Sequence, residues 1–205
     1  MSEPTANPLT SNEFEAAYRA TPPWEIGKPQ PAFLEAADRL RGRVLDSGCG
    51  TGELAMMAAG RGLDATGIDA APTAIRIARQ RAAERGLAVE FILGDVLKLA
   101  EVTHPPYDTV VDSGLLHVFA GTDRERYVAQ VAEAIAPGGL FMALCFSDRQ
   151  PGTWGPHRLN HDDLLDAFAR GWRIESIEPT TFVMADLPNV APQAQAYFVR
   201  ARRNL

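Results

Sequence analysis

The sequence predicts an α/β fold, in which a single, mostly parallel sheet is covered by helices on both faces. Short apolar runs alternate with longer segments of helical periodicity, which is the pattern of repeated strand–helix units. The first of these runs leads into a glycine-rich loop, and no internal repeat interrupts the alternation. With 205 residues and 46% hydrophobic content, the chain suits one domain with a sizeable core.

Seven strands are expected in order along the chain. They take the runs near residues 43–47, 64–69, 89–93, 107–112, 139–146, 172–183 and 194–203. The last run alternates apolar and charged residues, which indicates a half-exposed strand near an edge of the sheet. Helices fill the intervals, and Asn160 with Asp163 three positions later predicts a helix start.

The loop after the first strand is the most informative motif. Asp46 ends the strand, and Gly48, Gly50 and Gly52 then remove side chains where the backbone turns and approaches a ligand closely. A dinucleotide fingerprint has its third glycine where this chain has Glu53. Because two acids would repel a pyrophosphate, the loop is predicted to favour a cationic ligand.

This acid-x-Gly-x-Gly-x-Gly pattern resembles motif I of the class I S-adenosylmethionine-dependent methyltransferases. Later segments also resemble that family: Asp69, about 20 residues beyond the start of the loop, suits ribose hydroxyls, Asp95 suits the adenine amine, and Asp112 follows the fourth strand. The resemblance implies a Rossmann-like, doubly wound, seven-stranded sheet with an antiparallel C-terminal hairpin. It also implies S-adenosyl-L-methionine as cofactor and S-adenosyl-L-homocysteine as product. The predicted cofactor site comprises Trp24, Gly27, Gln30, Asp46, Gly48, Cys49, Gly50, Thr51, Gly52, Asp69, Ala70, Gly94, Asp95, Val96, Asp112 and Ser113.

The region before the first strand is predicted to form a lid. We divide the chain into residues 1–41, a lid or helical segment whose first ten or so residues are expected to be mobile, and a methyltransferase domain over 42–205. The segment PWEIGKPQP resembles the thiopurine and thiol branch of the family, and a bacterial branch acting on small heteroaromatics such as hydroxyquinolones. Trp24 is predicted to cover the cofactor or substrate, the alternative being that it only staples an N-terminal helix to the body.

A second variable segment, residues 147–160, is predicted to sit beside the methyl donor. There, Trp154 would stack on a flat acceptor, and polar neighbours would orient its edge. The predicted substrate-binding residues are Trp24, His117, Asp148, Trp154, His157 and Arg158.

Two histidines are the candidate catalytic residues. His117 lies just beyond the fourth strand and His157 lies in the second variable segment, and either would deprotonate or hydrogen-bond a hydroxyl acceptor. Alternatives are that His117 packs beneath the cofactor and that Asp112 is only structural. A thiol acceptor would need less help from a base, because it ionises readily near neutral pH.

Charge and composition indicate which classes of binding partner the chain is expected to have. A formal net charge of −6 argues against nucleic acid, and the Arg-rich stretch at residues 76–85 has the spacing of an exposed helix face. No apolar run is long enough to span a bilayer, and the start lacks a secretory pattern, so the expected location is cytoplasmic. Cys49 and Cys145 give no disulfide framework or metal spacing, and both are expected to be packing residues. A monomer or homodimer with a small-molecule acceptor is predicted.

Two other functions remain open from the residues alone. A nicotinamide-dependent dehydrogenase shares this sheet, but the chain has Glu53 in place of a glycine and no Tyr-x-x-x-Lys pair. A non-enzymatic S-adenosylmethionine-binding module would keep the glycine motif without an acceptor pocket.

Overall fold

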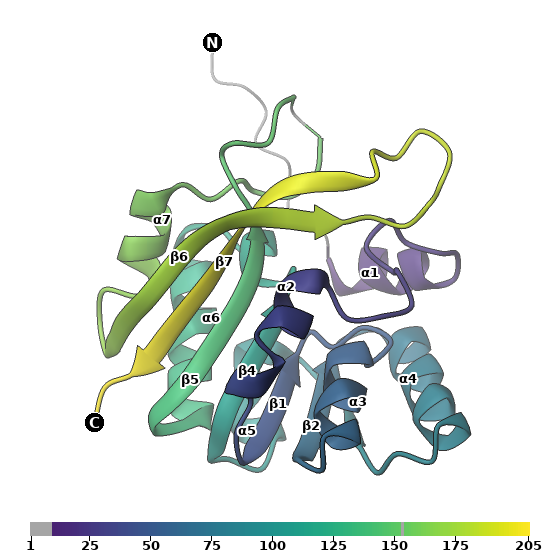
Figure 1. Cartoon of the computed structure of the whole chain (residues 1–205), viewed down its shortest axis with the longest axis horizontal. Coiled ribbons are helices and arrows are strands. Elements are labelled where there is room, and N and C mark those ends of the chain that lie inside the picture. The colour runs from purple at the N-terminus through teal and green to yellow at the C-terminus, as the bar shows by residue number, and fades with distance from the viewer. Residues whose placement is uncertain (1–9, 153) are drawn as a thin grey trace.

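A computed structural model describes residues 10–152 and 154–205, and shows one seven-stranded sheet (Figure 1). The strand order is β3-β2-β1-β4-β5-β7-β6. β1 to β5 are parallel to their neighbours, whereas β7 is antiparallel to both β5 and β6. The predicted mostly parallel sheet with an antiparallel C-terminal hairpin is therefore confirmed. The strands are β1 Arg43–Ser47, β2 Asp64–Asp69, β3 Glu90–Leu93, β4 Tyr107–Ser113, β5 Ile135–Phe146, β6 Trp172–Val183 and β7 Gln193–Arg203.

Six strands match their predicted ranges to within a residue at each end, but β5 begins four residues early. Ile135 already pairs with Tyr107, and the register shifts before Leu140 pairs with Thr109. The Pro-Gly-Gly stretch at residues 137–139 therefore forms an irregularity within the strand instead of a loop ahead of it. Residues on both sides of this irregularity pair with β4, so they belong to one strand.

Helices cover both faces of the sheet (Figure 1). Alternate β1 residues show why: Leu45 packs in a core with α5, α6 and α7, whereas Val44 packs in a second core with α2 and α3. A third cluster joins α3, α4 and Phe91 of β3. The α-helices are α1 Ser11–Tyr18, α2 Pro31–Glu35, α3 Glu53–Gly60, α4 Pro72–Glu84, α5 Leu99–Val102, α6 Gly121–Ala134 and α7 His161–Ala167. Short 3₁₀ turns lie at Ala37–Arg39, Val96–Lys98 and Leu116–Val118.

The N-terminal segment is attached to distant parts of the domain. Glu15 of α1 accepts hydrogen bonds from the backbone and hydroxyl of Thr73 at the start of α4. The Pro23 carbonyl accepts from the backbone of Ala185, just after β6. These contacts hold residues 21–30 across the carboxyl ends of the strands. The predicted mobility of the first residues concerns positions 1–9, which lie outside the described residues.

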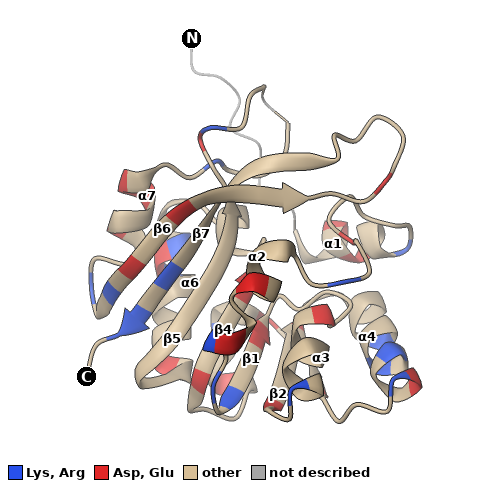
Figure 2. Cartoon of the chain, in the orientation of Figure 1, with Lys and Arg blue, Asp and Glu red and all other residues tan. Residues whose placement is uncertain are grey.

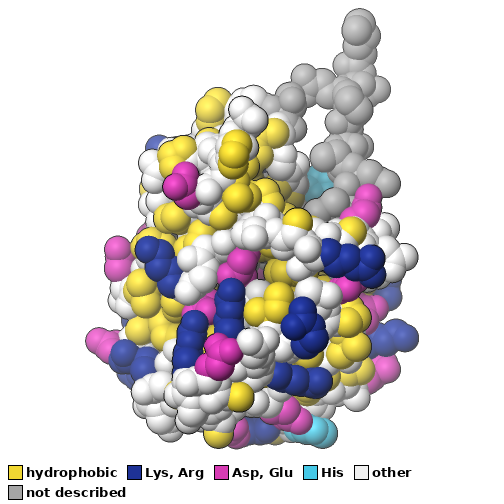
Figure 3. All heavy atoms as spheres, turned by 90° about the vertical axis from the view of Figure 1, so that its right-hand side faces the viewer, with side chains coloured by type: hydrophobic (Ala, Val, Ile, Leu, Met, Phe, Trp, Pro, Cys, Tyr) yellow, Lys and Arg dark blue, Asp and Glu magenta, His cyan; other side chains and the backbone are white. Residues whose placement is uncertain are grey.

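Charged side chains are distributed unevenly over the elements. Arginines gather on α4 and near the end of β7, whereas acids are spread over most elements (Figure 2). On the side shown in Figure 3, Lys and Arg side chains alternate with acidic and apolar ones. Within the described ranges, no helix has both the length and the apolar character needed to cross a bilayer. The same residues contain no cluster of three or more His, Cys, Asp or Glu suited to a metal ion.

Candidate functional site

A pocket of about 1100 Å³ lies at the carboxyl ends of β1, β2 and β4, beneath the N-terminal segment. Parallel sheets of this type bind ligands at this edge. The predicted residues that line it are Trp24, Gly27, Gln30, Asp46, Gly48, Cys49, Gly50, Thr51, Asp69, Ala70, Gly94, Asp95, Val96, Ser113, His117, Trp154 and His157. Four predicted residues, Gly52, Asp112, Asp148 and Arg158, do not line it.

The glycine loop presents its backbone to the pocket. Gly48 and Gly50 have φ of +68° and +53°, values that residues other than glycine rarely adopt. A Cβ on Gly50 would lie 2.5 Å from the Tyr18 hydroxyl oxygen, and one on Gly48 would lie 2.8 Å from Leu115. The loop therefore has space only for backbone at these two positions. Between them, Cys49 is buried and packs with the α3–α4 cluster.

Gly52 has a different place from the one predicted. It precedes α3 with φ of +85°, and a Cβ there would lie 2.6 Å from the Phe91 ring. Gly52 thus allows α3 to lie close to β3 and contributes no surface to the pocket. In a dinucleotide fingerprint the third glycine has this helix-packing role, and that glycine corresponds to Glu53, one position later in this chain.

The three aspartates that line the pocket lie in different environments. Asp46 is buried and accepts a hydrogen bond from the Ala55 backbone at 3.0 Å, and burial raises its pKa to about 8. Asp69 is also buried, which raises its pKa, and its carboxylate accepts from the backbones of Gly50 and Ala71 at 2.8 Å each. Asp95 is exposed and one of its oxygens accepts from the Leu97 backbone. The Asp69 carboxylate therefore holds the glycine loop in position at the pocket wall.

Asp112 is anchored away from the pocket. Its carboxylate accepts hydrogen bonds from the backbones of Leu115 and Leu116 and from the Tyr127 hydroxyl, at 2.7 to 2.9 Å. Full burial raises its pKa to about 7. The prediction that Asp112 contacts the cofactor is corrected: this carboxyl holds the loop after β4, which is the structural alternative.

Glu53 does not act as an uncompensated negative charge. It pairs with Arg81 at 3.1 Å and with Arg85 at 2.8 Å, both from the α4 region. The expectation that Glu53 repels a pyrophosphate therefore loses its basis, because two cations balance its charge. The prediction of an exposed face is likewise wrong for Arg81, which is partly buried and also contacts Glu25.

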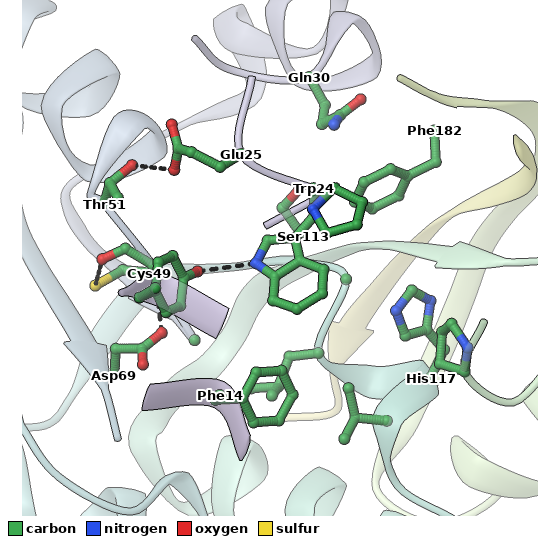
Figure 4. A pocket seen from close by; sticks show the side chains of 18 of the residues that line it. Phe14, Trp24, Glu25, Gln30, Cys49, Thr51, Asp69, Ser113, His117 and Phe182 are labelled. Atoms are coloured by element: carbon green, nitrogen blue, oxygen red, sulfur yellow. Dashed lines mark hydrogen bonds between the residues drawn. The ribbon is translucent and has the colours of Figure 1, made fainter. Parts of the chain in front are cut away.

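Residues 21–30, part of the predicted lid, contact both α1 and the glycine loop (Figure 4). The Trp24 indole N–H donates to the Tyr18 hydroxyl at 3.0 Å, while the Trp24 ring lines the pocket. Glu25 accepts hydrogen bonds from the Thr51 hydroxyl and from the Gly27 backbone. Trp24 therefore packs against α1 and also faces the pocket, which combines the two alternatives.

The Gln30 amide has a structural partner. Its Nε2 donates to the Val183 carbonyl and its Oε1 accepts from the Val183 N–H, both at 2.8 Å. This pair of bonds ties the lid to the end of β6. Gln30 also lines the pocket, so its polar contact with the cofactor stays a prediction.

Aromatic side chains surround His117 at the other end of the pocket. Phe146, at the end of β5, has its ring 4.9 Å from the His117 ring, 5.4 Å from Phe182 and 5.7 Å from Trp154. The His117 Nδ1 accepts a hydrogen bond from the Phe146 N–H at 2.8 Å. Burial, with a further contribution from His157, lowers the pKa of His117 to about 3. The lowered pKa makes the His117 ring a weak base near neutral pH, which argues against proton removal by this side chain and leaves its second predicted role, a hydrogen bond to the acceptor.

His157 lies in the same pocket under different constraints. Its backbone N–H donates to the His117 carbonyl at 3.2 Å. Its Nε2 is buried and has no hydrogen-bond partner among the residues that the structure describes. Burial lowers its pKa, and the charge of Arg124 acts in the same direction.

Two other predicted substrate-binding residues point elsewhere. Asp148 is exposed and accepts from the Tyr197 hydroxyl at 3.1 Å. Arg158 donates to the carbonyls of Trp154 and Gly152 within its own loop. Both predictions are corrected, because these side chains shape the loop that carries Trp154 and do not line the pocket.

Several lining residues were missed by sequence reasoning. Phe146 and Phe182 lie at or next to the ends of predicted strands, at the ligand-binding edge of the sheet. Their positions in the sequence could therefore have predicted that they line the pocket. Phe14 and Tyr18 carried no such signal, because only the docking of α1 brings them to the pocket. The missed lining side chains include Phe14, Tyr18, Leu115, Phe119, Phe146, Phe182, Met184 and Val190.

Comparisons with known proteins identify relatives of this chain. Residues 44–139 match a family model described as a methyltransferase domain. The chain is 37% identical over 179 residues to 2-heptyl-1-hydroxyquinolin-4(1H)-one methyltransferase of Mycobacteroides abscessus, covering 81% of this chain and 78% of that one. It is 34% identical over 122 residues to demethylmenaquinone methyltransferase of Thermus thermophilus, covering 58% of this chain and 54% of that one.

Solved structures are similar as well. One described as "Conversion of a Disulfide Bond into a Thioacetal Group during Echinomycin Biosynthesis" aligns with a TM-score of 0.85 at 37% identity, over 95% of this chain and 93% of that one. The Synechocystis magnesium protoporphyrin IX methyltransferase with bound S-adenosylmethionine shares the fold, with a TM-score of 0.63 at 18% identity, over 95% and 79% of the two chains. The glycine motif, the sheet and these relatives lead to one conclusion: the chain belongs to the class I S-adenosylmethionine-dependent methyltransferases.

Proposed function

We propose that this methyltransferase transfers the methyl group of S-adenosylmethionine to an oxygen, nitrogen or sulfur of a small, planar heteroaromatic acceptor, leaving S-adenosylhomocysteine. The observation that carries the proposal is the division of one pocket into an acidic end at the glycine loop and an aromatic end around His117. The relative from Mycobacteroides abscessus is named for a hydroxyquinolone, which supports an acceptor of this kind.

The acidic end fits the cofactor chemically. Backbone at Gly48 and Gly50 leaves room for close approach, because a Cβ at either position would collide with a neighbouring side chain. The carboxylates of Asp69 and Asp95 are suited to accept hydrogen bonds from ribose hydroxyls and from the adenine amine. A cationic group bound beside the buried Asp46 would lower the raised pKa of this carboxyl and favour its ionised form. When bound, S-adenosylmethionine supplies a methyl group that its positive sulfur makes electrophilic.

The aromatic end orients the acceptor and excludes water. Phe146 and Phe182 form two apolar walls, and the half-exposed Trp154 edge closes the outer side. A planar ring between these walls is held in few orientations, which is the main contribution that methyl transfer requires of the protein. A hydroxyl or thiol acceptor loses its proton to water or to His157, which is less buried than His117 and is therefore the better base of the two.

The experiment has two stages. Calorimetric titration with S-adenosylhomocysteine and, separately, with a nicotinamide dinucleotide is expected to show binding of the former alone. Purified protein is then incubated with S-adenosylmethionine and a panel of hydroxyquinolones, quinols, aromatic thiols and aliphatic alcohols and thiols, and products are detected by mass spectrometry. We expect a mass gain of one methylene on a heteroaromatic member. Methylation of aliphatic members only would overturn the acceptor class, and methylation of none would overturn the proposed function.

A further inference from the structure

We infer that His117 binds the acceptor as a fixed hydrogen-bond donor through its Nε2–H, and that it does not remove the acceptor's proton. The inference rests on the proposed function, since it concerns how that same pocket recognises its acceptor. The observation behind it is the geometry of a single backbone contact, supported by the chemistry of the groups around the ring.

The backbone contact determines which nitrogen carries the proton. Phe146 N–H donates to the His117 Nδ1 at 2.8 Å, so Nδ1 must offer its lone pair. A neutral imidazole has one protonated and one unprotonated nitrogen, so Nε2 carries the hydrogen. Phe146 lies in the paired part of β5, opposite Ala196 of β7, which holds the donor in place. His117 itself is 5% exposed, so its ring has little freedom to turn over.

The surroundings keep the ring neutral. Apolar rings of Phe146 and Phe182 cover it, and burial disfavours the imidazolium. The titratable and charged groups facing it are His157 from the loop after β5 and Arg124 from α6, and both further lower the pKa of His117. A backbone hydrogen bond with Gly114 raises this pKa but does not offset the effect of burial. Asp112 at the end of β4 directs its carboxylate to other partners. Among the described residues, no carboxylate is hydrogen-bonded to this imidazole.

A neutral donor in an apolar pocket selects for a particular acceptor. An oxygen or ring nitrogen that accepts the Nε2–H is bound, and partial negative charge on that atom strengthens the bond. The contact also sets the rotation of the acceptor ring within its plane. An acceptor without such an atom leaves a buried N–H unpaired, which disfavours its binding. We therefore place recognition at His117 and leave proton removal to the acceptor's own acidity, with water or His157 as the base.

The first test needs no methyl transfer. Long-range proton–nitrogen NMR spectra of ¹⁵N-histidine-labelled protein are recorded between pH 5.5 and 8, with the His117 signals assigned by their loss in His117→Gln. We expect one neutral form with hydrogen on Nε2 throughout. An imidazolium in this range, or hydrogen on Nδ1, would overturn the inference even if methyltransferase activity is normal.

The second test separates donor from base with two substitutions. A glutamine side chain is not a base but keeps an N–H near the position of Nε2, so His117→Gln should retain kcat/KM to within about 10-fold, whereas His117→Leu should lose about 100-fold. The exposed His104→Gln change serves as the control and should alter neither kcat nor KM. Equal losses for His117→Gln and His117→Leu contradict the donor role.

Acceptors of different acidity complete this test. If His117 removed a proton, an acceptor already ionised at the assay pH would restore the activity of His117→Leu. As a donor, His117 is still needed, so the deficit should persist. Failure of the wild-type protein to methylate any acceptor would count against the proposed function, whereas the NMR spectra decide the state of His117 separately.

Discussion

The Glu25 carboxylate accepts a hydrogen bond from the Arg81 guanidinium at 3.0 Å, and this pair joins the lid to α4 over the glycine loop. Arg81 also donates to the Thr51 hydroxyl, and Thr51 in turn donates to Glu25. The three side chains lie on three separate segments of the chain, and their contacts close a ring at the edge of the pocket, at the end proposed to hold the cofactor.

Arg81→Met should therefore speed the release of the cofactor product. Loss of the guanidinium leaves the partly buried Glu25 carboxylate unbalanced and removes the attachment of this segment to α4, so we expect S-adenosylhomocysteine to dissociate about 10-fold faster by stopped-flow measurement. Added salt should reduce the difference from wild type. Arg76→Met, an exposed change on the same helix, is the control. An unchanged dissociation rate would mean that the cluster only stabilises α4.

Asp69→Asn should weaken cofactor binding. The carboxylate holds the Gly50 and Ala71 backbones and faces the proposed ribose, and an amide offers one acceptor oxygen in place of two. We expect the Kd for S-adenosylhomocysteine to rise about 100-fold by calorimetry. Asp64→Asn alters the opposite end of the same strand and should leave the Kd unchanged. Similar losses for both variants would indicate a general effect on β2.

Gly50→Ala tests the closeness of α1 to the glycine loop. At φ of +53° an alanine is strained, and its Cβ also meets the Tyr18 hydroxyl. Gly62→Ala has similar backbone strain at φ of +80° but open space around it, so it should cost only stability, by about 1 kcal/mol. Gly50→Ala should in addition raise the Kd for S-adenosylhomocysteine at least about 10-fold. Adding Tyr18→Phe should recover part of that loss, and no recovery would argue against the contact.

Asp46 predicts how stability depends on pH. Burial raises its folded-state pKa from 3.8 to about 8, so between these values the native protein holds a proton that the unfolded chain releases. The free energy of unfolding should therefore fall as pH rises through this range, by at most about 1.4 kcal/mol per pH unit from this group. Asp112, whose pKa rises to about 7, adds to the fall below that value.

Urea unfolding of Asp46→Asn and wild type between pH 5 and 8 checks this expectation. The asparagine variant should show a shallower decline, because its amide does not titrate. Asp166→Asn, an exposed change on α7, should keep the wild-type slope. Equal slopes for all three proteins would show that Asp46 is ionised in the native state.

Trp154→Ala should affect the acceptor alone. The indole lies edge-on to Phe146 and is 42% exposed, at the outer side of the aromatic end. We expect the KM for the acceptor to rise about 10-fold while the Kd for S-adenosylhomocysteine stays constant. Leu165→Ala removes another exposed apolar side chain, on α7, and should change neither value. A parallel loss of cofactor affinity would place Trp154 at the cofactor instead.

Local patterns in the sequence were enough to predict the sheet and the glycine loop. Alternation of apolar runs with helical segments is a local property. The glycines at alternate positions after Asp46 allow a sharply turning backbone whatever the tertiary surroundings of the loop. Chain order alone then brought Asp46, Asp69 and Asp95 to one edge, because parallel strands all end there.

The roles of individual side chains depend on tertiary contacts. Gln30 and Asp112 have the residue types of ligand-binding groups, but Gln30 bonds the Val183 backbone on β6 and Asp112 accepts from the Tyr127 hydroxyl on α6. The Phe146 N–H of β5 donates to the His117 Nδ1, so the proton of the neutral ring lies on Nε2, which then donates a hydrogen bond and does not accept a proton. Hydrogen-bond partners and burial depend on residues far apart in the chain, so a pattern among sequence neighbours cannot determine them.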